Sequence, residues 1–212
     1  MKKIFGVLAV AALLASCSAL DQKIDYADGS AGKDNPIGLK GKAVTVSLLG
    51  GGAATLQGVT TSSGTFADIA GIPGGVALKK WGFTINLTTP TGGATMSGSN
   101  CPSNLTVTVN SLTLKVTDPT NTAGQFAPVT FAPSSLTLTE TATDCVYAVP
   151  ATPVIISAEI TGSNLASLAN IITTGGTNTV TATLDTTSAP TFSDRTLSLQ
   201  FGSGTGFVIA GI

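Results

Sequence analysis

The chain has no histidine among its 212 residues, and this absence removes a large part of enzyme chemistry. A Ser-His-Asp or Cys-His catalytic group cannot form without an imidazole. Histidine-ligated zinc, copper and non-haem iron sites are excluded for the same reason. Acid–base chemistry would therefore depend on carboxylates or lysines.

Carboxylates and aromatic side chains are also scarce. From residue 43 onward the acidic residues are Asp68, Asp118, Glu140, Asp144, Glu159, Asp185 and Asp194. Glu140 and Asp144 lie four residues apart beside Cys145, and glycosidases use a pair of carboxylates. Glycosidase clefts also carry several aromatic side chains, whereas this chain has one tryptophan and two tyrosines. We therefore expect no enzyme, no metal and no cofactor, with Glu140 and Asp144 as solvated loop charges.

A long hydrophobic run is missing too, because no stretch of about eighteen apolar residues occurs that could cross a membrane as a helix. The N-terminal apolar run covers residues 4–14 and follows Lys2 and Lys3. Small residues come directly after it. A positive start, a short apolar run and a small-residue cleavage site are the layout of a secretory signal peptide.

The residues at that cleavage site are Leu14-Ala15-Ser16-Cys17. This quartet resembles the lipobox of bacterial lipoprotein precursors, whose cysteine is thioether-linked to diacylglycerol. The resemblance implies a signal peptide over residues 1–16 and a lipidated N-terminus at Cys17, with palmitate-type acyl chains as the membrane anchor. Two or more chains give stable attachment. In relatives of the enteric type, a residue such as Ser18 after the cysteine implies the outer membrane; the leaflet stays open. The alternative is an ordinary secretory signal with an incidental cysteine.

Charge is low, with 10% Asp, Glu, Lys and Arg and a net charge of −1, so a basic face for nucleic acid is not expected. Eight charged residues lie within residues 21–42 among glycines and a proline. That composition predicts a lipidated N-terminus and flexible tether over residues 17–42. The tether aspartates do not fit a calcium loop, because Ile24 and Tyr26 stand where oxygen ligands are required.

Residues 43–212 alternate apolar and polar side chains with the period of β-strands. The main runs are 44–48, 83–87, 105–109, 112–116, 154–160 and 180–184. The apolar parity switches at Asn110-Ser111, which predicts a tight turn or a bulge. Glycine-rich residues 202–206 predict a hairpin between two further strands. We expect one all-β domain over residues 43–212, a β-sandwich or alternatively a barrel.

One segment has the period of a helix instead. Ser163 can cap a short helix over residues 164–172. Its apolar face would contain Leu165, Leu168, Ile171 and Ile172. We expect this helix to plug one end of the β core.

Cys101 and Cys145 remain after the lipidated cysteine. Export to an oxidising compartment predicts a disulfide between them. The alternatives are two free thiols or a metal site, and two cysteines without histidine make a poor zinc site.

Lys79-Lys80-Trp81 is a candidate contact patch for anionic lipid headgroups or an acidic glycan. The opposing interpretation follows from parity. Trp81 shares a strand face with Phe83 and Ile85, which would place its ring in the core and leave the lysines to keep a strand end soluble.

The domain derives its polarity from threonine, serine and asparagine, and such a surface can bind with little desolvation of charge. Our leading hypothesis is a non-catalytic cell-envelope lipoprotein, a structural or binding module that contacts envelope proteins, such as a surface layer, or cell-wall polymer. The alternative is a lipid-anchored carrier of an apolar ligand in a cavity of the sandwich or barrel. A membrane-spanning barrel is disfavoured by the few aromatics. An internal apolar void would favour the carrier.

Overall fold

The computed structural model describes residues 21–25, 34–48, 58–67, 77–118, 120, 123–148, 150, 153–173 and 177–211. The predicted signal peptide and Cys17 lie outside these residues. The described strands are β1 (Gln22–Asp25), β2 (Ala43–Ser47), β3 (Gly58–Ala67), β4 (Ala77–Thr88), β5 (Ala94–Thr95), β6 (Asn104–Thr117), β7 (Gln125–Val129), β8 (Ser134–Thr139), β9 (Val146–Tyr147), β10 (Val154–Thr161), β11 (Thr177–Ala189) and β12 (Thr196–Gly211), with helix α2 (Gly162–Thr173) between β10 and β11.

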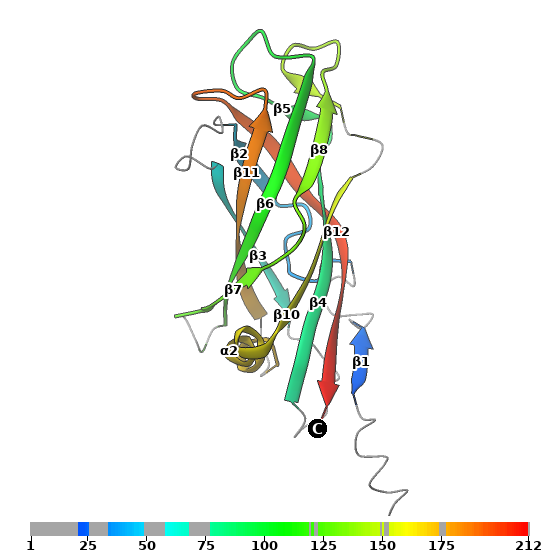
Figure 1. Ribbon diagram of the computed structural model, residues 1–212, viewed down its shortest axis with the longest axis vertical. Coiled ribbons are helices and arrows are strands. Elements are labelled where there is room, and N and C mark those ends of the chain that lie inside the picture. The colour runs from blue at the N-terminus through cyan, green and yellow to red at the C-terminus, as the bar shows by residue number, and fades with distance from the viewer. Residues whose placement is uncertain are drawn as a thin grey trace, which may run out of the picture.

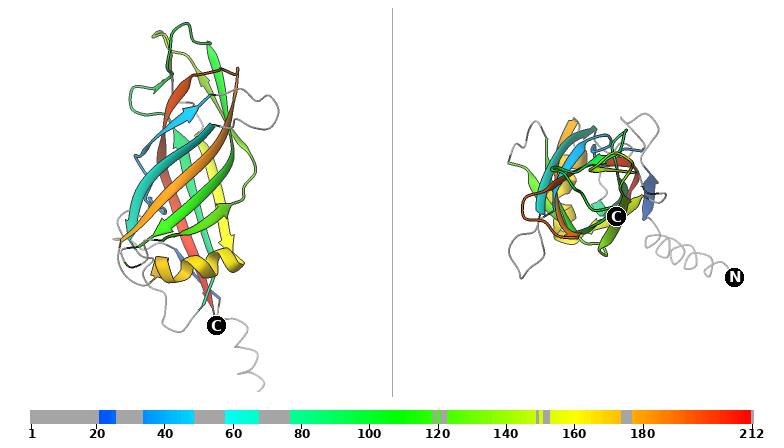
Figure 2. Two further views of the ribbon diagram at one scale, coloured as in Figure 1. Left: turned by 90° about the vertical axis from the view of Figure 1, so that its left-hand side faces the viewer. Right: turned by 90° about the horizontal axis from the view of Figure 1, so that it is seen from above.

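Two five-stranded sheets make up the body of the protein (Figure 1). The first has the order β1-β12-β4-β10, and β2 also pairs with β12. The second has the order β3-β11-β6-β7, and β8 also pairs with β6. The two sheets face each other across a common core, and within the described strands neither closes into a barrel (Figure 2). The predicted all-β sandwich is confirmed.

The core follows the predicted alternation of apolar and polar side chains. In β10, buried and exposed residues alternate over the whole strand. The largest fully buried side chains are Trp81, Tyr147 and Phe201. Because side chains of a strand point alternately to its two faces, strands such as β6, β8, β10 and β11 give one face to this core and the other to solvent. Burial of the inward apolar set supplies the main stabilisation of the fold.

The parity switch in β6 is a bulge. Asp185 pairs with Ser111 and Thr186 pairs with Val109, so Asn110 has no opposite residue in β11. One extra residue moves the following side chains to the other parity while the strand continues. Of the two predicted alternatives, the structure therefore has the bulge.

The predicted hairpin at residues 202–206 is wrong, because β12 runs through this segment as one strand. Phe201 pairs with Leu87 and Gly204 pairs with Ile85, which leaves one extra residue in β12 and makes a second bulge. A side chain at Gly204 would overlap the backbone of Thr84 in β4. The glycine thus permits a close approach of two strands, a role that sequence does not distinguish from a turn.

The N-terminal segment is part of the sheet, which corrects the predicted tether where the structure describes it. Strand β1 pairs with the end of β12, and β2 pairs with its beginning. Between them, the carbonyl of Phe201 accepts from the Gly41 N–H at 2.8 Å, and the Phe201 N–H donates to Lys42 at 3.0 Å. The N–H of Gly204 donates to the carbonyl of Asp34 at 2.7 Å. Backbone pairing along one edge of β12 therefore fixes these residues in place.

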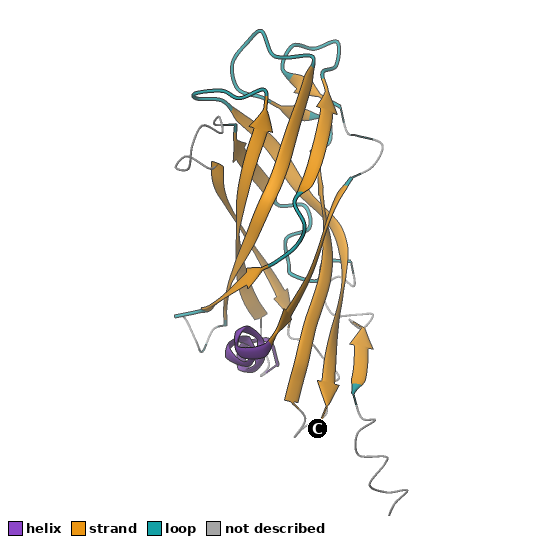
Figure 3. Cartoon of the chain, viewed as in Figure 1, coloured by secondary structure: helices purple, strands orange, loops and turns teal. Residues whose placement is uncertain are grey.

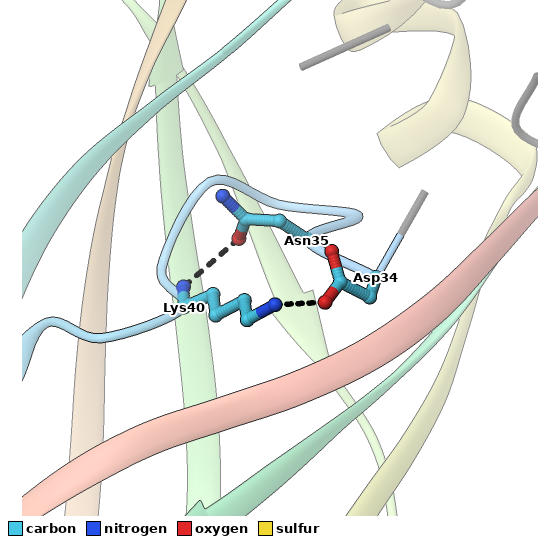
Figure 4. A network of polar contacts seen from close by, with 3 residues as sticks. All are labelled: Asp34, Asn35 and Lys40. Atoms are coloured by element: carbon cyan, nitrogen blue, oxygen red, sulfur yellow. Dashed lines mark hydrogen bonds and ion pairs between the residues drawn. The ribbon is translucent and has the colours of Figure 1, made fainter. Parts of the chain in front are cut away.

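Two buried side chains explain why this charged segment is ordered. Ile37 and Leu39 are 0% and 1% exposed, and both belong to the core. The charges around them stay at the surface, where Lys40 forms an ion pair with Asp34 and donates its backbone N–H to the Asn35 side chain at 2.9 Å (Figure 4). The segment was predicted to be a linker because its overall composition is rich in charge and glycine. Composition does not reveal that two of its residues, Ile37 and Leu39, anchor it in the core.

Helix α2 covers one end of the sandwich, as predicted (Figure 3). Its buried residues are the expected set Leu165, Leu168, Ile171 and Ile172. The helix packs against β4, β7 and β10, so its apolar face closes the space between the two sheets at this end. We call this the α2 end.

Candidate functional site

A disulfide joins Cys101 and Cys145 at the opposite end of the sandwich, and the predicted pairing is confirmed. The two Cα atoms are 5.1 Å apart, and the cysteines are 44 positions apart in sequence. The bond ties the segment before β6 to the turn before β9. We call this the disulfide end.

The two carboxylates nearest the disulfide bind backbone groups. Glu140 Oε1 accepts from the Cys145 N–H at 2.7 Å. Asp144 accepts from the N–H of Cys101 at 3.2 Å and from that of Asn100 at 3.1 Å. These bonds, first the one from Cys101, hold the pKa of the Asp144 carboxyl below its usual value. Asp144 is exposed and Glu140 is partly exposed, as expected for loop charges, and both carboxylates in addition hold the loops around the disulfide.

The same four residues lie close enough to be considered as metal ligands. Donor atoms of Cys101, Glu140, Asp144 and Cys145 lie within 4.8 Å of one another. A metal site of this composition would need the two sulfurs as thiolates. Here they are bonded to each other, so the cluster acts as a structural clamp.

Arg195 and Tyr147 complete this end and were missed in the sequence. Arg195 donates to the carbonyl of Ser99 at 2.8 Å and to Cys101 Sγ at 3.3 Å. The Tyr147 hydroxyl donates to the carbonyl of Pro102 at 2.8 Å, and burial raises the pKa of Tyr147 to about 12. These partners lie 45 to 96 residues apart, and no local pattern connects them.

A hollow of about 420 Å³ lies beside Arg195, lined by Ser97, Gly98, Ser99, Asp194 and Arg195. The guanidinium group faces the Phe192 ring at 5.1 Å and uses donors on Ser99 and Cys101. The contacts of Arg195 therefore stabilise the loops that surround it.

The candidate contact patch at Lys79, Lys80 and Trp81 does not form a shared surface. Trp81 is 0% exposed and its ring lies 5.8 Å from that of Phe83 in the core. Lys79 pairs with Asp21 at 2.5 Å, and Lys80 pairs with Glu159 at 2.7 Å. The structure supports the parity interpretation, in which the indole is a core residue.

The outward face of β6, β8 and β11 in the second sheet consists mainly of hydroxyl side chains, with Lys115 and Asp185 among them. We define this hydroxyl face by Thr106, Thr108, Thr113, Thr117, Ser135, Thr137, Thr139, Thr179, Thr181, Thr183 and Thr187, which are partly or fully exposed on β6, β8 and β11. Register places them in rows: Thr187 is opposite Thr108, which is opposite Ser135. Within this row Thr108 and Ser135 share a hydrogen bond at 2.7 Å. Composition predicted a neutral surface but not its arrangement in rows.

A second hollow, of about 370 Å³, lies over the first sheet. It is lined by Phe83, Thr84, Thr130, Ser157, Ala158, Glu159, Thr205 and Phe207. Five of these eight side chains are polar, including the carboxylate of Glu159. The lining therefore combines these polar groups with the rings of Phe83 and Phe207.

Comparison with known proteins gives no match to a family model, to a curated protein or to a solved structure. Among the described residues, no helix has both the length and the hydrophobicity needed to cross a membrane.

Proposed function

We propose that the protein is a lipid-anchored, non-catalytic lipoprotein of the bacterial cell envelope that binds cell-wall polymer through its hydroxyl face. The lipobox resemblance at Leu14-Ala15-Ser16-Cys17 supports the anchor. The observation that supports the binding role is the regular array of threonine and serine side chains on β6, β8 and β11.

The hydroxyl face combines a low cost of desolvation with a regular spacing of its hydroxyl groups. Strands lie about 4.8 Å apart, and side chains on one face recur about every 6.8 Å along a strand. Hydroxyls exchange hydrogen bonds with water for bonds with another hydroxylated surface at far smaller cost than ions do. Each bond contributes little, about 0.5–1.5 kcal/mol, so useful affinity needs several in register. A polymer with repeating sugar units can supply them.

Other observations favour a contact role over an enzyme or a carrier. Glu140 and Asp144 bind backbone N–H groups of the loops around the disulfide. The space between the sheets holds large side chains, including Trp81 and Phe201, and the hollow over the first sheet is lined by both polar and apolar side chains, with the carboxylate of Glu159 among them. We therefore place the working surface on the outside of the domain.

Sedimentation with purified peptidoglycan sacculi tests this proposal. The mature lipidated protein, in mild detergent, is mixed with sacculi and the bound fraction is measured. A triple variant with Thr108→Val, Thr183→Val and Thr187→Val removes three hydroxyls from the face while keeping β-branched shapes. We expect its affinity to fall about tenfold or more, since three lost hydrogen bonds of about 0.5 kcal/mol each correspond to that factor.

The matched control replaces the same three residues by serine, which retains every hydroxyl. We expect this variant to bind sacculi nearly as well as the wild type. Equal binding of the valine variant and the wild type would exclude the hydroxyl face as the binding surface. Wild-type protein that stays in the supernatant, but crosslinks to another envelope protein, would replace the polymer by a protein partner.

A further inference from the structure

The N-terminus enters the fold at the α2 end. Gln22 in β1 pairs with Ala210 near the end of β12, and the Asp21 carboxylate pairs with Lys79 near the start of β4. The last residue of β10, Thr161, pairs with Lys80 and leads directly into α2. Strand β1, the end of β12 and helix α2 therefore occupy the same end of the sandwich (Figure 1).

The distance from the lipidation site to this end is short. Cys17 precedes Asp21 by four residues, which span about 14 Å at most when fully extended. Strand β4 runs from the α2 end toward the disulfide end over 12 residues, or about 40 Å. A lipid anchor at Cys17 thus keeps the α2 end close to the bilayer and gives the disulfide end no comparable tether.

The surface of the α2 end suits contact with lipid headgroups. Helix α2 has no charged residue in its sequence GSNLASLANIIT, so little ionic desolvation opposes its approach to a membrane. Strand β7 packs against this helix and presents Phe126, which is 61% exposed. Lys115 Nζ lies 5.4 Å from the centre of the Phe126 ring. An exposed aromatic ring beside a lysine is a combination found where proteins lie in a membrane interface.

The ionised groups near β1 are matched in pairs. Lys23 pairs with Asp25 at 2.8 Å, and its ammonium also lies 4.7 Å from the centre of the Phe207 ring. Lys79 and Lys80 each pair with a carboxylate. Pairing limits the repulsion that free carboxylates would meet at an anionic headgroup layer.

We propose that the α2 end, with α2, Phe126 and Lys115, rests on the phospholipid surface while the disulfide end points away from it. This inference depends on the proposed lipidation of Cys17. In this orientation the strands stand roughly upright, and the hydroxyl face on β6, β8 and β11 is presented beside the membrane to material in the adjacent compartment.

Quenching by headgroup-labelled lipid tests the orientation. Ala166→Cys places a thiol on the exposed side of α2, and Thr91→Cys places one in the exposed turn after β4 at the disulfide end. In the mature lipoprotein each is the only free thiol, because Cys17 is thioether-linked and Cys101 is bonded to Cys145. Each variant is labelled with one fluorophore and reconstituted into phosphatidylcholine vesicles that contain a headgroup nitroxide. We expect strong quenching at residue 166 and little at residue 91.

Two further variants separate tethering from surface contact. Fifteen Gly/Ser residues inserted between Leu20 and Asp21 add a reach of about 20 Å and should reduce the difference between the two labels. Phe126→Ser in this long-tether protein should remove the remaining difference. In this last variant a water-soluble nitroxide should quench both labels equally.

Equal quenching of the two labels in the lipidated protein, or stronger quenching at residue 91, would overturn the orientation. Intact mass spectrometry of the same samples reports whether Cys17 carries acyl chains. If it does not, the proposed anchor fails and the orientation fails with it. If it does and the labels are quenched equally, only the orientation fails.

Discussion

Asp144 binds the backbone of Cys101, which lies 43 residues earlier in the chain, at 3.2 Å from its carboxylate oxygen. The next residue, Cys145, is bonded to the same cysteine through sulfur. Asn100 and Cys145 both have positive φ values, 54° and 63°, a region that few side chains other than glycine adopt. The covalent bond and the carboxylate together hold this strained connection at the disulfide end.

The Asp144 bonds predict a dependence of stability on pH. The pKa of the Asp144 carboxyl is lowered from 3.8 in the folded protein, chiefly by the N–H groups of Cys101 and Asn100. Its stabilising effect is therefore fully present above 3.8 and is lost as the pH falls through the folded value. Asp144→Asn should lower the melting temperature at neutral pH, and the difference from wild type should vanish in strong acid. Asp194→Asn is the control, and a difference that persists in strong acid would assign the effect to packing.

Removal of the disulfide should destabilise the domain without changing its fold. Closing a loop of 44 residues restricts the unfolded chain and contributes about 4 kcal/mol in the chain-entropy model. Denaturant unfolding of a Cys101→Ala/Cys145→Ala variant, followed by the fluorescence of the buried Trp81, should show a loss of this order. Before reduction, thiol labelling of the denatured wild type should find neither cysteine free. Labelling of both would contradict the pairing.

The buried N-terminal residues predict a cost that a tether would not have. Leu39 is 1% exposed, and truncation to alanine should destabilise the protein by about 2–5 kcal/mol. Lys42→Ala, an exposed change three residues later, should stay within about 0.5 kcal/mol of wild type. Denaturant unfolding measures both variants. Equal stabilities of wild type and Leu39→Ala would restore the tether interpretation.

Sequence predicted the features that depend on local pattern or on the compartment. The alternation of apolar and polar residues predicted the strands, because one side of a half-buried strand faces the core and the other faces solvent. Four apolar positions at helical spacing predicted the helix. The disulfide was predicted because two cysteines remain after lipidation and the protein is expected to be exported. None of these features depends on which strand lies beside which.

The features that sequence missed depend on pairing between distant residues. The segment containing Ile37 and Leu39 is held by backbone bonds to β12, more than 150 residues away. The glycines of residues 202–206 have the composition of a turn, yet pairing with β4 on one side and the bond from the Gly204 N–H to the Asp34 carbonyl on the other keep them extended. Arg195 and Ser99 are 96 residues apart in sequence and come into contact only in the folded protein. Propensity reports local preference, and tertiary pairing overrides it here.

Gly82 and Phe207 should show coupled effects on stability. The Phe207 ring in β12 lies over Gly82 in β4, and a side chain added at residue 82 would overlap the ring. Gly82→Ala should cost about 1–3 kcal/mol through this overpacking. In a Phe207→Ala background the space is free, so the cost should be much smaller. A double-mutant cycle by denaturant unfolding measures the coupling, and strictly additive losses would show that the ring moves aside without penalty.

The last prediction concerns the anchor at Cys17. In the described residues the outward faces of β6, β8 and β11 carry mainly threonine and serine, so these strands offer no continuous apolar band to lipid. Phe126 and the uncharged α2 can add only weak surface contact. The acyl chains must then supply most of the membrane affinity, at about 0.8 kcal/mol per buried methylene. A protein beginning at Ser18 behind an ordinary secretion signal should therefore fold and fractionate away from membranes. Release of this form only by strong detergent would contradict the prediction, whereas its retention in the envelope fraction through a wash with high salt and mild detergent would point to a protein partner.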